Sequence, residues 1–494
     1  MTPIPAHTIG GVRTQIWLDL QEAMKGAGHR FSYVLYAALM GMVAVFCFAS
    51  VDNYLPTDLT LMLNTRFIEG ASVFSGYLSY FDFLVIIVSI LLLERYRPSF
   101  FGSKLALRFL FIAAVLTVLL DLVNPNDESP KQLGLPLLAN LPAYIFLLFM
   151  AAVFFMREEG FLFVMRRVGR IVGIALTIRA AMLLLLWLAG KGNYKFGGVN
   201  SALTEGDSLL VYAFAATMLF ASLLIRKRFW PFVAWVLCVL VEILSFRRSA
   251  LFVLLGAHAF TLVFHMLLKR RVASMVKNVL LASLVLGVVA FAAAQVIPND
   301  TLQFYMNRYF GMFLGMGQSE RDTYAGDSGH FDESSSTMEY AFYKMEFWGY
   351  GGGSSDRINI PGATLRLWVH NVYAATWLYR GIYALLFYGL LGFVLLLMLM
   401  KVIVKRRFVD PAYSLIVGAA IASMIMLMVA WYSNPVQIAE SLRMRVLWVS
   451  VLALIFRLTP ENVATAFPAM SRSLQTGQRH TEPRRFITPR MTTE

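Results

Sequence analysis

His370 is the residue of this chain best placed to do chemistry, because it stands where a long polar segment gives way to an apolar run that begins NVYAATWLYRG. An imidazole accepts a proton near neutral pH, so a histidine at such a boundary could act as a general base toward an incoming hydroxyl group. The alternative is a histidine that only caps the following helix at the membrane surface. His370 is therefore a candidate catalytic residue whose role depends on the groups around it.

Arginines supply the complementary charge at positions where membrane proteins rarely carry it. One interrupts an apolar run, two lie in a turn on the side otherwise poor in basic residues, and two open the last apolar run. These are Arg179, Arg247, Arg248, Arg443 and Arg445. Guanidinium groups remain charged and bind phosphate oxygens bidentately. The five arginines together predict a site for an anionic lipid, and a lipid diphosphate fits them best. Each arginine alone could simply contact lipid headgroups.

Arg179 needs compensation of its own. A charge near the middle of a spanning helix costs about 2.5–3.5 kcal/mol on insertion scales. An ion pair with a buried acid, Glu242 or Asp121, would provide it. A phosphate ligand would do so equally well, and the sequence leaves both explanations open.

Membrane helices are the elements that must hold these residues. Hydrophobic residues make up 58% of the chain, charged residues 15%, and the mean hydropathy is +0.64. Such a composition predicts an all-α, polytopic integral membrane protein of about twelve transmembrane helices, since apolar runs near the length that crosses about 30 Å of hydrocarbon recur along it. The runs lie roughly at 33–50, 79–94, 108–123, 134–156, 170–190, 209–225, 229–246, 249–268, 278–297, 372–400, 411–432 and 436–457.

Basic residues recur in every second connection between these runs, as the positive-inside rule expects of cytoplasmic loops. The net charge of +14 is then mostly a topology signal with some attraction to anionic membrane lipids, and we expect no nucleic-acid partner. The expected organisation is a cytoplasmic segment at 1–32, helices one to nine at 33–297, a large outward loop at 298–369, helices ten to twelve at 370–458, and a disordered cytoplasmic tail at 459–494.

Metal chemistry and disulfides are not expected. Cys47 and Cys238 both fall inside apolar runs, where a cysteine packs as a small apolar side chain. His330, Asp332 and Glu333 lie in the outward loop without the spacing of a metal site.

The pattern around the histidine resembles a known superfamily. His370-Asn371, the nine residues 372–380 and then Gly381 are similar to a motif of the O-antigen ligases and polymerases, which also place a glycine-containing turn, here 349–353 with Gly351, shortly before the histidine. The resemblance covers about 230–457. In two places the chain departs from the pattern: Ala384 stands where the family has another small or an aromatic residue, and the nearest arginine before the loop helix is Arg321.

The resemblance implies a glycosyltransferase in the bacterial inner membrane, with its active site facing the periplasm. The donor would be an undecaprenyl-diphosphate-linked glycan and the acceptor a glycan or lipid A core, without cofactor or metal. His370 would be the base, while Asn371, Gly381, Gly351 and Arg321 would support the loop. The residues of the diphosphate clamp would be Arg247, Arg248, Arg179 and Arg443.

Two questions stay open at the level of sequence. A ligase and a repeat-unit polymerase for O-antigen or exopolysaccharide would share these residues. A lipid-linked oligosaccharide transporter would also have about twelve spans and membrane arginines, although transporters of that kind tend to carry substrate residues near mid-membrane and internal repeats. If His370 is not the base, an outer-loop carboxylate such as Glu339 or Glu346 becomes the candidate.

Overall fold

The structure is a computed structural model that describes most of the apolar part of the chain. The described residues are 29–48, 80–123, 141–190, 193–195, 199–201, 211–245, 248–269, 335, 337–343, 347, 371–405, 410–432 and 442–460. The predicted span at 278–297 and nearly all of the predicted outward loop lie outside them.

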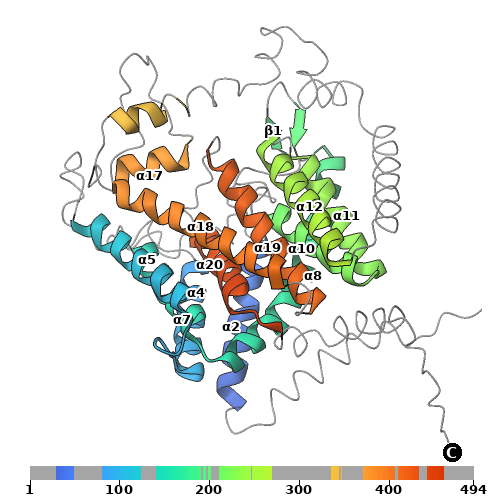
Figure 1. Ribbon diagram of the computed structural model, residues 1–494. Helices are drawn as coiled ribbons and strands as arrows, with labels where there is room; N and C mark the ends of the chain where they lie inside the picture. Colours follow the sequence, from blue (N-terminus) through green and yellow to red (C-terminus); the bar gives the residue numbers. More distant parts are fainter. Residues whose placement is uncertain are drawn as a thin grey trace, which may run out of the picture.

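Helices make up almost all of the described chain (Figure 1). In order they are α2 (His29–Phe48), α4 (Tyr80–Tyr96), α5 (Leu105–Val123), α7 (Leu141–Phe155), α8 (Glu158–Leu188), α10 (Ala213–Ile225), α11 (Phe229–Ile243), α12 (Arg248–Lys269), α17 (Val372–Arg380), α18 (Ile382–Lys405), α19 (Pro411–Ala430) and α20 (Leu442–Arg457). A short antiparallel hairpin, β1 (Asn193–Lys195) with β2 (Val199–Ser201), is the one departure from helix among the described segments that have regular structure. The predicted helical class is confirmed.

Four helices in the described part of the chain are long and apolar enough to cross a bilayer. Their apolar stretches are Ile171–Leu188, Ser249–Leu268, Leu385–Val404 and Pro411–Ala430. Shorter apolar helices coincide with further predicted runs, at Val34–Ala44, Leu105–Leu119, Ala143–Phe155, Ala213–Ile225 and Phe229–Ile243. The chain is thus a helical membrane protein, and the full number of spans remains a prediction.

Helix α19 occupies the centre of the bundle (Figure 1), and most of its residues are buried. Its closest neighbour is α12, which runs antiparallel to it. Glycines let the two helices approach: Gly256 of α12 faces Met426, and Gly418 of α19 faces Phe264, whose ring would lie 2.8 Å from a Cβ atom added at Gly418. Small residues at a helix contact allow the backbones to come close, which is the usual source of helix association inside a membrane.

Arg457, the last residue of α20, ties that helix to the end of α7. Its guanidinium donates to the carbonyl oxygens of Val153 at 2.9 Å, Phe154 at 3.2 Å and Met156 at 2.6 Å. The last carbonyl groups of a helix have no partner within it, so a cation at this position both bonds them and opposes the negative end of the helix dipole. We call this end of the bundle the Arg457 end.

Lys104, in the connection between α4 and α5, makes the matching contact to α20. Its ammonium donates to the carbonyl oxygen of Phe456 at 2.5 Å. Burial lowers the pKa of Lys104, and the nearby charges of Lys401 and Arg457 lower it further. The basic connections after the second, fourth and last predicted spans therefore meet at one end of the bundle, as expected of loops on one side of a membrane.

The apolar run 372–400 was expected to form one helix, and the structure divides it in two. Helix α17 ends at Arg380 and α18 begins at Ile382, with Gly381 between them at φ 84° and ψ 173°. Side chains with a Cβ atom rarely adopt this backbone conformation, so glycine permits the break. The motif glycine is thus the joint that separates a short helix beside the predicted loop from a spanning helix.

We expect Gly381→Ala to destabilise the protein by about 1–3 kcal/mol, because alanine would be strained at this positive φ. Thermal unfolding of the detergent-solubilised protein, followed by size-exclusion chromatography of the heated samples, measures the change. Gly389→Ala is the matched control, since Gly389 lies inside α18 with no neighbouring atom within 4 Å of an added Cβ. Equal midpoints for the two variants would contradict the strained joint.

Candidate functional site

The start of α17, directly after His370, is fixed to the end of α19. Asn371 is fully buried and its side-chain oxygen accepts from the backbone N–H groups of Tyr373 at 2.9 Å and Ala374 at 3.0 Å, which makes it the N-cap of α17. The N–H of Val372 donates to the carbonyl oxygen of Trp431 at 3.0 Å. The chain next to His370 is therefore held in place, and we call this end of the bundle the Trp431 end.

Aromatic side chains strengthen this attachment. The hydroxyl group of Tyr373 donates to the carbonyl oxygen of Met428 at 2.6 Å, one turn before the end of α19. The ring centroid of Trp431 lies 6.5 Å from that of Tyr373 and 5.6 Å from that of Tyr388 on α18. Such edge-on contacts contribute about 0.5–1.5 kcal/mol each beyond the burial of their area. Helices α17, α18 and α19 are thus locked together where α19 ends.

The arginine positions at the starts of α12 and α20 lie at the same end of the bundle as this attachment. Because α12 pairs antiparallel with α19 through Gly256 opposite Met426, its first residue, Arg248, lies about one turn beyond the end of α19. Helix α20 returns from that end, and Trp448 lines one cavity together with Leu427, a turn before Trp431. Arg443, in the first turn of α20, is therefore also near the Trp431 level. The side chains of Arg248 and Arg443 lie outside the described part of the structure.

Arg179 lies near the Trp431 level. Its guanidinium carbon lies 5.8 Å from the ring centroid of Tyr212, and both side chains are buried between α8 and α10. Phe214, two residues after Tyr212, lines a cavity together with Leu427, which is one turn before Trp431. Arg179 is thus close to the same end of the bundle, about one turn deeper than the position of Arg248.

The acid that could have compensated Arg179 is not bonded to it. Glu242 is fully buried in α11, and neither of its carboxyl oxygens accepts a hydrogen bond from Arg179 or any other residue that the structure describes. The expected alternative of an Arg179–Glu242 pair is therefore wrong for this structure. The side chain of Asp121 lies outside the described residues, so the second acid remains a prediction. Isolated carboxyl groups in an apolar interior are costly, which makes Glu242 a buried polar group in need of a role.

The partly buried His258 of α12 is satisfied by its neighbours. The indole N–H of Trp235 donates to Nε2 of His258 at 2.9 Å, and Nδ1 lies 2.8 Å from the carbonyl oxygen of Leu254. A carbonyl oxygen only accepts, so Nδ1 carries the proton and the imidazole is neutral. Its ring also lies 4.7 Å from that of Phe220. His258 is a packing residue of α10, α11 and α12, and it does not compete with His370 as a base.

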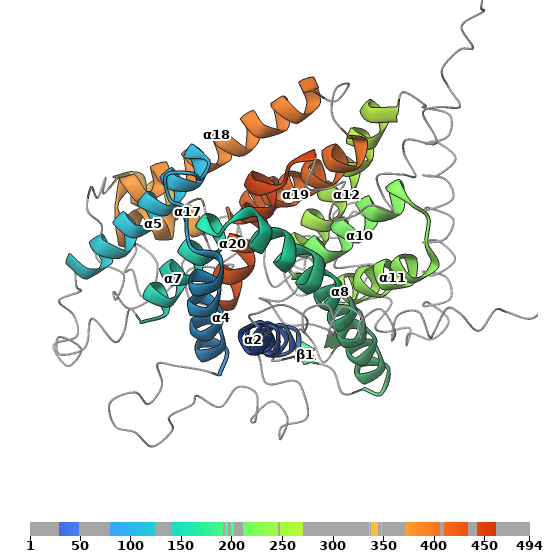
Figure 2. The ribbon, with the colours of Figure 1, turned by 90° about the horizontal axis from the view of Figure 1, so that it is seen from below.

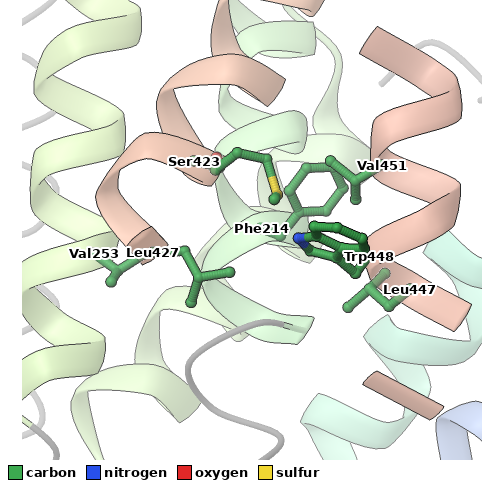
Figure 3. A pocket seen from close by; sticks show the side chains of 8 residues that line it. Phe214, Val253, Ser423, Leu427, Leu447, Trp448 and Val451 are labelled. Carbon is green, nitrogen blue, oxygen red and sulfur yellow. The ribbon is translucent and has the colours of Figure 1, made fainter. Parts of the chain in front are cut away.

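A small apolar cavity lies one turn below the Trp431 end, among α10, α12, α19 and α20 (Figure 3). Its volume of about 10 Å³ has room for about one water molecule. Figure 3 shows Phe214, Leu427 and Trp448 facing one another across it from three helices. The indole N–H of Trp448 is buried there and makes no hydrogen bond to the described residues. The cavity is too small for a glycan, so these side chains form an apolar floor beneath the Trp431 end.

The other predicted site residues fall outside the described part of the chain. They are His370, Arg247, Gly351 and Arg321, together with His330, Asp332, Glu333 and Glu346. Glu339 is described and is exposed on a short helix near α17. Within the described residues no group of three or more histidine, cysteine or acidic side chains could hold a metal ion.

Sequence inspection missed the residues that hold the site together. Tyr373, Trp431 and Tyr388 lie in apolar runs, where aromatic side chains at helical spacing usually indicate core packing. Tyr212, the ring under Arg179, carries no more signal than its neighbours. The N-cap role of Asn371 was not predicted either, although asparagine before a helical run is a strong capping residue and carried the signal for it.

We expect Asn371→Ala to loosen the start of α17 at a cost of about 0.5–2 kcal/mol, since two backbone N–H groups lose their acceptor. Hydrogen exchange of the Tyr373 and Ala374 amides, read by mass spectrometry of peptides that cover them, should then become faster. Asn371→Ser keeps a capping oxygen and is the matched control. Unchanged exchange in the alanine variant would contradict the cap.

Comparison with known proteins leaves the family unassigned. No protein-family model, no curated protein and no solved structure matches this chain. The superfamily resemblance rests on His370, Asn371, Gly381 and the segment around them, and the activity that it implies is a proposal.

Proposed function

We propose that the protein is a membrane glycosyltransferase that moves a glycan from undecaprenyl diphosphate to an acceptor hydroxyl group at the Trp431 end of the bundle. One observation carries the proposal. The backbone positions of Arg248 and Arg443 lie at the same end of the bundle as the bond between Val372 and Trp431, and Val372 is two residues after His370. Residues far apart in the sequence thus come to one end of the bundle.

The electrostatics of this end favour an anionic ligand. Arg248 opens α12 and Arg443 lies in the first turn of α20, so both cations stand where the helix dipole is already positive. An arginine there is unfavourable by itself, and an anion would compensate both the side chain and the helix end. The amides at the start of α17 are occupied by Asn371 and Trp431, so that helix end adds no free donors. A diphosphate clamp would draw on α12 and α20.

The proposed reaction is a displacement at the anomeric carbon of the donor sugar. His370 takes the proton of the acceptor hydroxyl group while the acceptor oxygen forms the new glycosidic bond. The bond from the anomeric carbon to the diphosphate oxygen breaks, and undecaprenyl diphosphate leaves with the electron pair. Arginines near the departing oxygens stabilise the charge that develops on them. The acceptor is either a lipid A core or the next lipid-linked repeat unit, which makes the enzyme a ligase or a polymerase.

Buried polar residues favour a transporter as the second candidate. Arg179 and Glu242 are buried inside the bundle, and buried ionisable residues in membrane helices often mark substrate or ion paths in transporters. Purified protein in detergent, given a lipid-linked glycan and an acceptor, distinguishes the two functions. An enzyme forms a new glycosidic bond there although no compartment exists, whereas a transporter forms none.

Replacing His370 with alanine should reduce glycan transfer by about 10²–10⁴-fold, the usual contribution of a positioned general base. The measurement is transfer from purified undecaprenyl-diphosphate-linked glycan to acceptor, with thermal unfolding as a check on folding. A chelator should leave the wild-type rate unchanged because the proposed chemistry uses no metal. Near-normal transfer by the alanine variant would show that His370 is not the base, and Glu339 or Glu346 would become the candidate base.

Lysine at Arg247 or Arg248 should lower transfer although the charge is kept, because an ammonium cannot bind a diphosphate bidentately. Alanine at either position should lower it further, by about 10²–10³-fold if the guanidinium stabilises the leaving group as an oxyanion-hole donor does. Lys227→Ala is the control, since it removes an exposed cation from the turn between α10 and α11. Wild-type turnover in both arginine-to-alanine variants would place the diphosphate nearer Arg179 or Arg443.

A further inference from the structure

A short helix of the otherwise undescribed loop packs on α17 (the gold segment in Figure 1). Within residues 337–343, Thr337 and Ala341 are fully buried. Ala341 forms an apolar cluster with Ala374, Trp377 and Leu378 of α17. The ring of Phe342 meets that of Trp377 edge-on, with centroids 5.8 Å apart. This part of the loop therefore has a defined position on the surface of the bundle.

Large aromatic side chains of the same part of the loop remain exposed. Phe342 is 65% exposed, Tyr343 83% and Phe347 57%. We call these three residues the aromatic patch. Clustered apolar surface of this kind usually marks an interaction site, because exposing it to water costs about 25 cal/mol for each Å².

The aromatic patch continues the lipid-facing surface of α18. The ring of Phe347 meets that of Tyr383, in the first turn of α18, with centroids 6.2 Å apart. From there an exposed apolar stripe follows the helix at intervals of three and four residues, through Leu386, Leu390, Phe393, Leu397, Met400 and Val404. Because α18 has the length and composition of a spanning helix, this stripe faces acyl chains.

Helix α5 extends the same surface sideways. It lies beside α17 and α18 in both views (Figures 1 and 2). Phe109, Ile112 and Leu116 of α5 are exposed, which is expected of a second helix that faces lipid. The aromatic patch thus stands at the edge of a continuous apolar surface, and its ring contacts to the described helices are with α17 and the start of α18.

We infer that the aromatic patch inserts into the bilayer interface at the Trp431 end and anchors the loop on the membrane surface. Aromatic residues are enriched at the boundary between headgroups and acyl chains, where their apolar rings leave water. A bilayer is favoured over a protein partner because the patch is continuous with the lipid-facing stripe of α18. The anchor would set the depth of α17, and with it the depth of the chain next to His370. The inference concerns the membrane surface and holds whether or not the protein is a glycosyltransferase.

Nitroxide depth measurements test the anchor in the full-length protein. Cys47 and Cys238 are replaced by serine and alanine, a single cysteine is introduced as Tyr343→Cys and spin-labelled, and the protein is reconstituted into phosphatidylethanolamine–phosphatidylglycerol vesicles. The readout is the collision rate of the label with oxygen, which concentrates in lipid, relative to that with a water-soluble nickel chelate. Tyr343 is the most exposed residue of the patch, so the substitution disturbs little packing.

Two reference positions bracket the result. Leu390→Cys on the stripe of α18 reports the acyl region, and Lys227→Cys in the turn between α10 and α11 reports water. We expect the oxygen-to-nickel ratio at position 343 to lie between those of the two references and to fall to the value of Lys227 when the vesicles are exchanged for lipid-free amphipol. A ratio in vesicles equal to that of Lys227 would overturn the anchor. Low collision rates with both reagents would overturn it too, because they would show that protein covers the patch.

Discussion

Helix ends govern this architecture, because a backbone carbonyl or amide that faces lipid has no water to bond and must find a partner inside the protein. At one end of the bundle, Arg457 bonds three carbonyl oxygens at the end of α7 and Lys104 bonds one at the end of α20. At the other end, the side chain of Asn371 and the carbonyl oxygen of Trp431 accept the amides that open α17. Each of these contacts except the Asn371 cap joins separate helices, so satisfying the backbone also assembles the bundle.

The two ends use positive charge in opposite ways. At the Arg457 end the cations meet carbonyl oxygens, which are the negative ends of helix dipoles, and their charge is locally compensated. At the Trp431 end the arginine positions open α12 and α20, where the helix dipoles are positive, while the last turns of α11 and α19 bring negative helix ends to the same side. The proposed anion would face the starts of α12 and α20.

Helix α17 connects the described part of the loop to the spanning helices. Asn371 caps it, its first amide bonds to the end of α19, and Ala374 and Trp377 pack on the loop helix. The backbone break at Gly381 separates it from α18. These attachments fix the depth and direction of this short helix. Phe214, Leu427 and Trp448 form an apolar layer one turn below the Trp431 end.

The sequence by itself determined the class of protein and the general positions of its helices. Composition and run length depend only on the chain, and the apolar runs near 33–50, 79–94, 249–268 and 411–432 coincide with α2, α4, α12 and α19. It also singled out Asn371 and Gly381 as positions of a motif, whereas their roles as N-cap and helix joint appear only in the structure.

Only the tertiary structure decided which helix ends share a level, because antiparallel register depends on side-chain packing between residues far apart in the chain. The contact of Gly256 with Met426 sets where Arg248 lies relative to the end of α19, and no sequence pattern near either residue predicts that contact. The structure also decided the surroundings of Arg179, because its guanidinium group lies against the ring of Tyr212 and does not bond to Glu242, the acid expected from the sequence. Opposite charges in a sequence show that a pair is possible, but the geometry of packed helices determines whether the two groups meet.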